Sequence, residues 1–200
     1  MGGLHHLLHG EAVMSRVAIF IDGGYMDRVL RDEFAGAKIS YAAFSHEISA
    51  QIHPNPDILR TYYYHCLPYQ SNPPTQVESQ RFASMQNFLD AINRLPRFEV
   101  RLGRLARRGP DIRGRYFFEQ KMVDVLLSID LVHLSSKGQI AYVAIVGGDS
   151  DFVPAIKMAK NEGVSVWLLH GGRVHNDLRD IADERIRITD DLVNRILWQP

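Results

Sequence analysis

The stretch Val143-Ala-Ile-Val-Gly-Gly-Asp149-Ser-Asp151-Phe-Val-Pro154 decides how the rest of the chain is interpreted. Its first four residues form a continuous apolar run, which is typical of a strand buried on both faces of a parallel sheet. Two glycines then permit a sharp turn, and Pro154 falls in the first turn of the helix expected next. Asp149 and Asp151 thus follow the carboxyl end of a buried strand, where open α/β sheets usually carry their sites. Helix capping accounts for only one of these acids, so the pair favours a function.

The same order of residues occurs near the start of the chain. The apolar run 16–21 is followed by Asp22-Gly23-Gly24 and then by a helical pattern. If both strands are central and parallel, Asp22 and Asp149 emerge at the same edge of the sheet. Adjacent strands lie about 4.8 Å apart, so carboxylates at neighbouring strand ends can share one metal ion.

Strand and helix patterns alternate along the whole chain. Further strands are predicted at 58–66, 98–102, 164–169 and 185–188. Helices are predicted at 25–34 and 116–134, and after Ser40, Thr75, Asp151, His175 and Asp190. The alternation predicts an α/β fold with three layers, α/β/α, around a central, mainly parallel sheet.

Size and composition indicate one globular domain. We expect residues 15–200 to form it, and residues 1–14, which contain Gly2-Gly3 and three histidines, to be an N-terminal extension. The formal net charge is zero, which argues neither for nor against nucleic acid as a partner. The single cysteine, Cys66, cannot form an internal disulfide, so a reducing cytoplasm is the default location. No apolar run approaches the length of a membrane span, and the sequence leaves a homodimer open.

A block of arginines is the one strongly asymmetric charge pattern in this neutral chain. Only Glu99 and Asp111 oppose it, and its members are Arg94, Arg97, Arg101, Arg104, Arg107, Arg108, Arg113 and Arg115. One interpretation is a solvated basic loop. The other is a contact surface for a phosphate backbone, because the guanidinium fork suits phosphate. On the second interpretation, Arg104, Arg107 and Arg108 bind substrate.

The helix predicted at 116–134 carries another acid. Its buried face is expected to contain Phe118, Met122, Val125, Leu126, Ile129 and Val132. Lys121, Asp124 and Ser128 form a separate polar stripe. Because Asp124 has apolar neighbours, its charge needs compensation, and either Lys121 or a bound metal could supply it.

Four aspartates therefore remain as candidate catalytic and metal-binding residues: Asp22, Asp124, Asp149 and Asp151. Carboxylate oxygens are hard ligands that suit Mg²⁺ or Mn²⁺, and there is no Cys/His pair at the spacing of a zinc site. A divalent ion would relieve their mutual repulsion and orient a phosphodiester for hydrolysis. Lys121 could contact substrate phosphate or hold Asp124, and Ser150 could donate to the metal shell.

These segments resemble the NYN domain, specifically the LabA-like branch of the PIN-like nuclease superfamily. The resemblance rests on Phe20-Ile-Asp-Gly-Gly24, Lys121-Met-Val-Asp124, Gly148-Asp-Ser-Asp-Phe152 and Gly163-Val-Ser-Val166, and it covers the chain from about 15 to 188. It implies a PIN-like fold and a ribonuclease that depends on Mg²⁺ or Mn²⁺ and acts on RNA, which we expect to be single-stranded. By position, the metal-binding aspartates of the family correspond to Asp22, Asp124, Asp149 and Asp151.

The sequence departs from the family pattern at two places. Many members carry Asn where this chain has Gly24 or Tyr25, and many carry Ser where it has His175 and Asn176. Both places concern substrate positioning, for which Asn176 is the candidate here. The alternative function is a non-catalytic RNA-binding or regulatory module on the same scaffold. A phosphatase or a receiver-type protein fits less well, because Gly24 stands two residues after Asp22 and no Lys directly follows the strand at 164–169.

Overall fold

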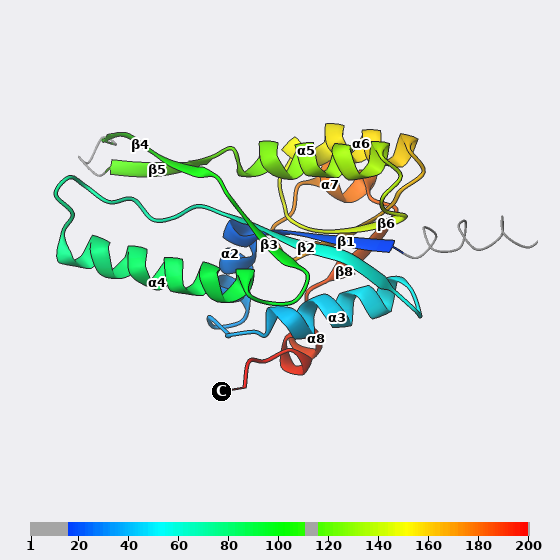
Figure 1. Ribbon diagram of the computed structural model, residues 1–200, viewed down its shortest axis with the longest axis horizontal. Helices are drawn as coiled ribbons and strands as arrows, with labels where there is room; N and C mark the ends of the chain where they lie inside the picture. The colour runs from blue at the N-terminus through cyan, green and yellow to red at the C-terminus, as the bar shows by residue number, and fades with distance from the viewer. Residues whose placement is uncertain (1–15, 111–115, 200) are drawn as a thin grey trace, which may run out of the picture.

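The computed structural model describes residues 16–110 and 116–199, and its centre is a parallel sheet (Figure 1). Among these residues the sheet has six strands in the order β3-β2-β1-β6-β7-β8. Every neighbouring pair is parallel. The strands are β1 Arg16–Asp22, β2 Asp57–His65, β3 Phe98–Leu102, β6 Tyr142–Val146, β7 Ser165–His170 and β8 Glu184–Arg187. The predicted α/β fold with a central parallel sheet is confirmed.

The two central strands are apolar because both of their faces are covered. Residues 17–21 of β1 and 143–146 of β6 have no solvent exposure. Alternate residues of β1 enter different cores: Ile19 packs with α2, α3 and α4, whereas Phe20 packs with α5 and α6. Burial on both faces explains why the sequences of the two strands are continuous apolar runs.

Helices form the two outer layers. One layer contains α2 Gly23–Glu33, α3 Tyr41–Ile52, α4 Gln76–Asn93 and α8 Asp190–Arg195. The other contains α5 Val123–Ser136, α6 Val153–Asn161 and α7 Asn176–Ile181 (Figure 1). Ser40 caps α3 as predicted, and Thr75 begins α4 with a complete capping box. The cap of α8 is Thr189, whose hydroxyl accepts from Leu192 N, and not the predicted Asp190.

The strand order places a topological switch point between β1 and β6. The chain leaves β1 towards β2 on one side, and β6 pairs with β1 on the other side. In open parallel sheets, the crevice at such a point is the usual ligand site. Asp22 ends β1 and Asp149 closely follows β6, so both acids reach the same edge, as predicted.

The helix predicted at 116–134 is wrong in its first part. Tyr116–Lys121 is strand β5, which pairs in antiparallel fashion with β4 Arg104–Pro110, and α5 begins only at Val123. Two features explain the difference. Tyr116-Phe117-Phe118 favours a strand, and Met122 has a positive φ of 73°, which separates the strand from the helix. Figure 1 shows β4 and β5 as a narrow arm that projects beyond the sheet.

The buried face predicted for this helix is wrong in part, although Leu126 and Val132 pack against the core as predicted. Val123, Leu127, Leu131 and Leu134 face the core, whereas Val125 and Ile129 are 55% and 58% exposed. Residues of α5 are apolar on several sides, so periodicity alone did not identify the buried one. Among the described residues, no helix has both the length and the hydropathy that a membrane span requires.

Candidate metal centre

Three of the four predicted aspartates come together at the edge of the sheet. Asp124 is the second residue of α5, Asp149 follows β6, and Asp151 lies in the short 3₁₀ helix η1, Ser150–Phe152. One carboxylate oxygen from each lies within 4.8 Å of the others. Asp124 is partly buried, whereas Asp149 and Asp151 are exposed. The arrangement is therefore an acidic cluster that is open to solvent on one side.

The turn before Asp149 is held by close packing on two glycines. A Cβ on Gly147 would lie 2.8 Å from the ring of Phe152, and one on Gly148 would overlap the ring of Tyr25. Phe152 is fully buried and fixes η1 against the core. The Asp149 carboxylate accepts a hydrogen bond of 3.1 Å from Asp151 N, so it caps η1. Only glycine permits this turn, which brings Asp149 and Asp151 to the same place.

Asp22 lies next to the cluster and has a second role. It is the N-cap of α2, and its carboxylate accepts a hydrogen bond of 3.0 Å from Tyr25 N. Its side chain is buried, and it is outside the group of three close carboxylates. Its negative charge nevertheless acts on Asp124, as the pKa of that residue shows. The fourth predicted aspartate thus adds charge behind the cluster and stabilises the start of α2.

The electrostatics of the cluster favour a bound cation. Burial, followed by the charges of Asp22, Asp149 and Asp151, raises the pKa of Asp124 to about 6. Burial also raises the pKa of Asp22, although the Tyr25 N–H and the charges of Arg28 and His65 oppose this effect. Carboxylates with raised pKa values are ionised at a free-energy cost, and a divalent ion would remove that cost.

The donor set fits Mg²⁺ or Mn²⁺. Asp124, Asp149 and Asp151 offer only carboxylate oxygens, the ligands that hard cations prefer. Two ligands of one Mg²⁺ ion lie at most about 4.2 Å apart, since each is about 2.1 Å from the metal. The observed limit of 4.8 Å is close to this value, so small side-chain rotations would allow one ion to bind all three residues.

A groove begins at the cluster and runs between α5 and α6. Its volume is about 660 Å³, and Asp124 and Asp151 form its acidic end. Val125, Ile129 and Met158, each between 46% and 58% exposed, form its apolar walls. The side chains wrongly predicted to be buried in α5 therefore line a surface groove beside the candidate centre.

The predicted substrate-binding residues come from three parts of the fold: η1, the start of α7 and the arm formed by β4 and β5. Ser150 is partly buried between Asp149 and Asp151 in η1. Asn176 is exposed at the start of α7, directly after His175, whose N–H donates 2.9 Å to Gly148 O. Arg104 in β4 pairs across the arm with Lys121, the last residue of β5. Arg107 and Arg108 lie further along β4.

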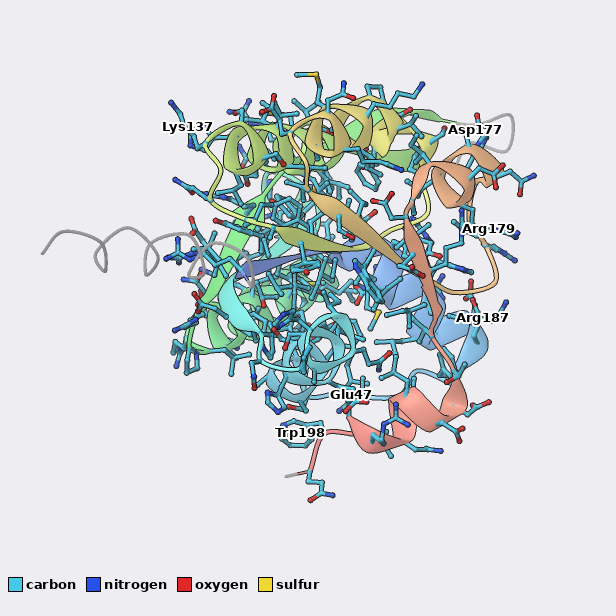
Figure 2. All side chains as sticks on the ribbon, turned by 90° about the vertical axis from the view of Figure 1, so that its right-hand side faces the viewer. Glu47, Lys137, Asp177, Arg179, Arg187 and Trp198 are labelled. Atoms are coloured by element: carbon cyan, nitrogen blue, oxygen red, sulfur yellow. The ribbon has the colours of Figure 1, made fainter. Side chains whose placement is uncertain are left out.

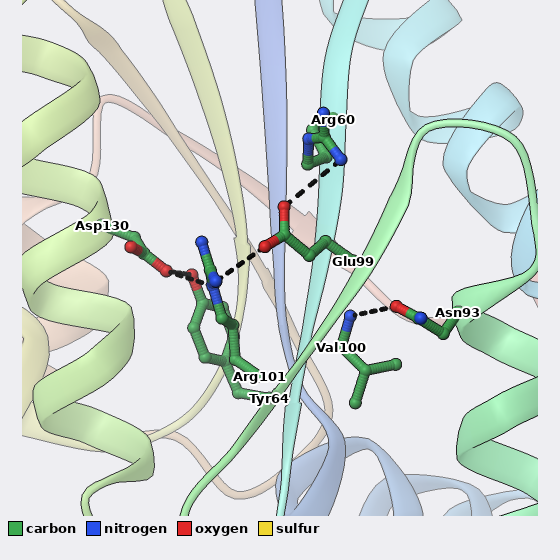
Figure 3. A network of polar contacts seen from close by, with 7 residues as sticks. All are labelled: Arg60, Tyr64, Asn93, Glu99, Val100, Arg101 and Asp130. Atoms are coloured by element: carbon green, nitrogen blue, oxygen red, sulfur yellow. Dashed lines mark hydrogen bonds and ion pairs between the residues drawn. The ribbon is translucent and has the colours of Figure 1, made fainter.

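Part of the arginine block has a structural role. Figure 3 shows Arg101 between Glu99, at 2.6 Å, and Asp130, at 3.3 Å. Asp130 also accepts a hydrogen bond of 2.9 Å from the Tyr64 hydroxyl, and Arg60 pairs with the other side of Glu99. Arg97 pairs with Asp57 at 2.9 Å. The solvated-loop interpretation is wrong for Arg101, which lies in β3, whereas Arg97 is exposed in the turn before that strand. Arg113 and Arg115 lie outside the described residues.

The structure also identifies contacts near the cluster that are not evident from the sequence. Tyr25 packs on Gly148, and its hydroxyl donates to Arg173 O at 2.8 Å. Arg28 is close enough to Asp22 to lower the pKa of that carboxyl. These residues come from α2 and from the loop after β7, and no local motif relates the two segments. A spacing of three residues places Tyr25 and Arg28 on one side of a helix, but this signal is too common to indicate a site.

Comparison with known families agrees with this geometry. Residues 16–189, which include every strand of the sheet and the three clustered aspartates, match the NYN domain. No curated protein matches the chain. The match covers far more than half of the sequence, and the parallel sheet with helices on both faces is the PIN-like arrangement expected for such a domain. The chain belongs to the NYN domain family.

Proposed function

We propose that this protein is a metal-dependent ribonuclease that hydrolyses RNA phosphodiester bonds at the acidic cluster. The observation that carries the proposal is the convergence of Asp124, Asp149 and Asp151 at the switch point of an NYN domain. NYN domains are generally ribonucleases, and a cluster of hard oxygen ligands suits phosphodiester chemistry.

In this proposal, Asp124, Asp149 and Asp151 hold Mg²⁺ or Mn²⁺, and Asp22 adds negative charge behind them. When bound, such an ion lowers the pKa of water and stabilises charge on the phosphodiester. Ser150 donates a hydrogen bond at the rim of the centre, and Asn176 orients the substrate at the start of α7. The four aspartates are therefore the catalytic residues of the proposal.

The basic residues of the arm would hold the RNA backbone. The register of β4 and β5 places Arg104 opposite Lys121, three residues before Asp124. Arg107 and Arg108 continue the basic sequence along β4. Guanidinium groups bind phosphate through paired hydrogen bonds, so the arm would guide the strand towards the aspartates. We propose single-stranded RNA as the substrate, the LabA-like branch as the nearest group, residues 15–200 as the domain and the cytoplasm as the location.

A non-catalytic RNA-binding module is the second candidate. The observation in its favour concerns Tyr25, which lies near the position where many family members carry Asn and which bonds to the protein rather than facing a substrate. Its hydroxyl accepts from Gly171 N at 3.0 Å and donates to Arg173 O, so it is committed to the protein itself. On this reading the scaffold would bind RNA without cleaving it.

Cleavage of labelled single-stranded RNA separates the two candidates. We expect cleavage in Mn²⁺ or Mg²⁺ and none in excess EDTA. Asp149→Asn keeps a side chain that can cap η1 but removes the charge, so it should reduce the rate about a hundredfold or more. The matched control is Asp177→Asn, an exposed acid in the first turn of α7 (Figure 2), which should retain the wild-type rate.

Two outcomes would contradict the ribonuclease. Equal cleavage by the wild type and Asp149→Asn would mean that another site, or a contaminant, cuts the RNA. Tight RNA binding by the wild type with no cleavage in either metal would establish the non-catalytic module instead.

A further inference from the structure

A second group of arginines lines a pocket at the C-terminal half of α2 and the loop after β7. The volume of this pocket is about 400 Å³. Arginines outnumber acids in its lining, where Arg28, Arg173 and Arg187 lie beside Asp32 and Glu33, with Tyr25 among the uncharged residues. We propose that this pocket binds a backbone phosphate of the RNA strand, next to the phosphodiester at the aspartates. The inference rests on the proposed function for its ligand, and it adds a binding site that neither the arm nor the aspartates include.

The pocket has a rigid base. The Tyr25 hydroxyl bonds to Gly171 N and Arg173 O, and the Glu33 carboxylate accepts a hydrogen bond of 2.6 Å from Gly172 N. Glu33 also pairs with Arg187 at 3.4 Å. Figure 2 shows Arg187 on β8, close to α2. These contacts join α2, β8 and the loop, so the backbone at Arg173 is tied to α2, which also carries Arg28.

The charge available in the pocket comes from Arg28 and Arg173. Arg28 is exposed, and its guanidinium lies 5.9 Å from the centre of the Tyr25 ring. No ion pair joins it to a carboxylate among the described residues. The Arg173 side chain is 91% exposed and reaches only Asp32, at 3.9 Å. Since Arg28 has no carboxylate partner in the described part of the chain, and the contact of Arg173 with Asp32 is long and exposed to solvent, both guanidinium groups can bind an anion.

The pocket and the acidic cluster share a wall. The ring of Tyr25 lies between the pocket and Gly148, the residue before Asp149. On the cluster side, Gly148 O accepts the hydrogen bond from His175 N, two residues after Arg173. Arg28 also acts on the charge of Asp22, which lies behind the cluster. An RNA strand with one phosphodiester at the aspartates would therefore present a neighbouring phosphate to these arginines.

The chemistry selects phosphate as the ligand. The cluster concentrates negative charge, so an anionic polymer can approach it only if cations hold the flanking groups. Arg28 and Arg173 supply two guanidinium forks, which form paired hydrogen bonds with phosphate oxygens. Tyr25, by fixing Arg173 O, is a positioning residue for this pocket.

The test is RNA binding by the double variant Arg28→Ala/Arg173→Ala. Asp149→Asn is included in every protein to prevent cleavage, Mn²⁺ is present, and the probe is a short labelled single-stranded RNA. We expect the affinity to fall about tenfold. The slope of log K against log salt should become shallower by about 0.7, since the pocket holds one phosphate and each phosphate contact contributes about 0.7 for a single strand. Arg28→Lys/Arg173→Lys keeps both charges and should lose less affinity.

The matched control is Arg195→Ala. Arg195 is an exposed arginine of α8 that pairs with Glu47. The helix α8 belongs to the layer on the opposite face of the sheet from α5. The substitution removes one positive charge from the protein without changing the pocket, so the RNA affinity and the salt slope should equal those of the Asp149→Asn protein. Melting temperatures of all variants show whether each is folded.

The outcomes separate this inference from the proposed ribonuclease. If the double variant keeps the reference affinity and salt slope, the phosphate pocket is overturned, although RNA cleavage by the wild type would still support the nuclease. If the wild type binds RNA without cleaving it and the double variant loses affinity, the pocket stands and the nuclease fails. If the wild type neither binds nor cleaves RNA, both proposals fail.

Discussion

The ring of Tyr25 lies directly against the backbone of Gly148, although the two residues are far apart in sequence. Tyr25 belongs to α2, after β1, and Gly148 to the turn after β6. Their contact therefore joins the two central strand ends at the point where the acidic residues emerge. The same ring separates the candidate metal centre from the arginine pocket. The packing of one aromatic side chain thus affects both proposed parts of the site.

Gly148→Ala should disturb this contact. A Cβ at this position would overlap the Tyr25 ring and lie 3.0 Å from Arg173 O. We expect a loss of about 1–3 kcal/mol in the free energy of unfolding, because the turn must shift to accommodate the methyl group. RNA cleavage should fall with it, since Asp149 follows the turn directly. Gly109→Ala is the stability control, because a Cβ there meets no atom within 4 Å. Equal stability of both variants would show that the turn tolerates a side chain.

Two substitutions on α5 test which side of this helix is buried. Leu127 has no solvent exposure, whereas Ile129 is 58% exposed. Leu127→Ala should therefore reduce the free energy of unfolding by about 2–5 kcal/mol, and Ile129→Ala by less than about 0.5 kcal/mol. Denaturant unfolding of both variants provides the measurement. The sequence pattern, which assigned Ile129 to the buried face, predicts a large loss of stability for Ile129→Ala as well.

Much of the fold was predictable because the central strands are covered on both faces. The apolar runs that end at Asp22 and before Gly147 are typical of buried parallel strands, and each is followed by glycines and a helical pattern. Once two such strands are adjacent, their acids must reach one edge. The closeness of the Asp149 and Asp124 carboxylates was harder to predict from the sequence, because it depends on how α5 packs beside η1.

The arm and the arginine pocket depend on contacts that the sequence does not mark. Tyr116–Lys121 has enough apolar residues to fit a helix, although its aromatic residues favour a strand, and the pairing with β4 decides between the two. Arg173 reaches its place because the loop after β7 is tied to Tyr25 and Glu33 through backbone atoms. Backbone atoms are the same in every residue type, so the loop sequence does not reveal that these hydrogen bonds form.

Asp183 gives a prediction about acid stability. Burial raises the pKa of its carboxyl, but hydrogen bonds from Lys160 and from Val166 N outweigh this effect and lower the pKa below its usual value. The Lys160 Nζ lies 2.7 Å from the carboxylate and Val166 N lies 2.8 Å from it. A carboxyl with a lowered pKa in the folded state stabilises the protein above its unfolded pKa. This contribution is lost as the pH falls through the folded value.

Asp183→Ala should therefore cost about 1 kcal/mol at neutral pH, a modest amount because the side chain is 36% exposed and solvent screens the ion pair. The difference from the wild type should shrink below about pH 4. Thermal unfolding across the acid range measures it. Asp180→Ala, at an exposed position of α7, is the control and should show a smaller effect. A difference that stays constant with pH would mean that the carboxylate charge is not responsible.

Asp124→Asn should stabilise the protein when metal is removed. Burial, followed by the charges of Asp22, Asp149 and Asp151, raises the pKa of Asp124 to about 6, so at neutral pH its ionised form opposes folding. An uncharged amide removes this opposition. We expect a gain of about 1 kcal/mol after solvent screening is allowed for, or about 2–4 °C in melting temperature in excess EDTA. Asp90→Asn, at an exposed position of α4, should give no comparable gain.

Adding Mn²⁺ should reverse the order of stability. A ligand that binds only the folded state raises the free energy of unfolding, and the wild type keeps all three carboxylates of the cluster. Its melting temperature should therefore rise with Mn²⁺ concentration, whereas that of Asp124→Asn should rise much less. If both proteins gain equally from Mn²⁺, the ion binds elsewhere. If Asp124→Asn is less stable than the wild type in EDTA, the charge of Asp124 is already compensated by the protein itself, and the electrostatic reason for a metal at this edge of the sheet disappears.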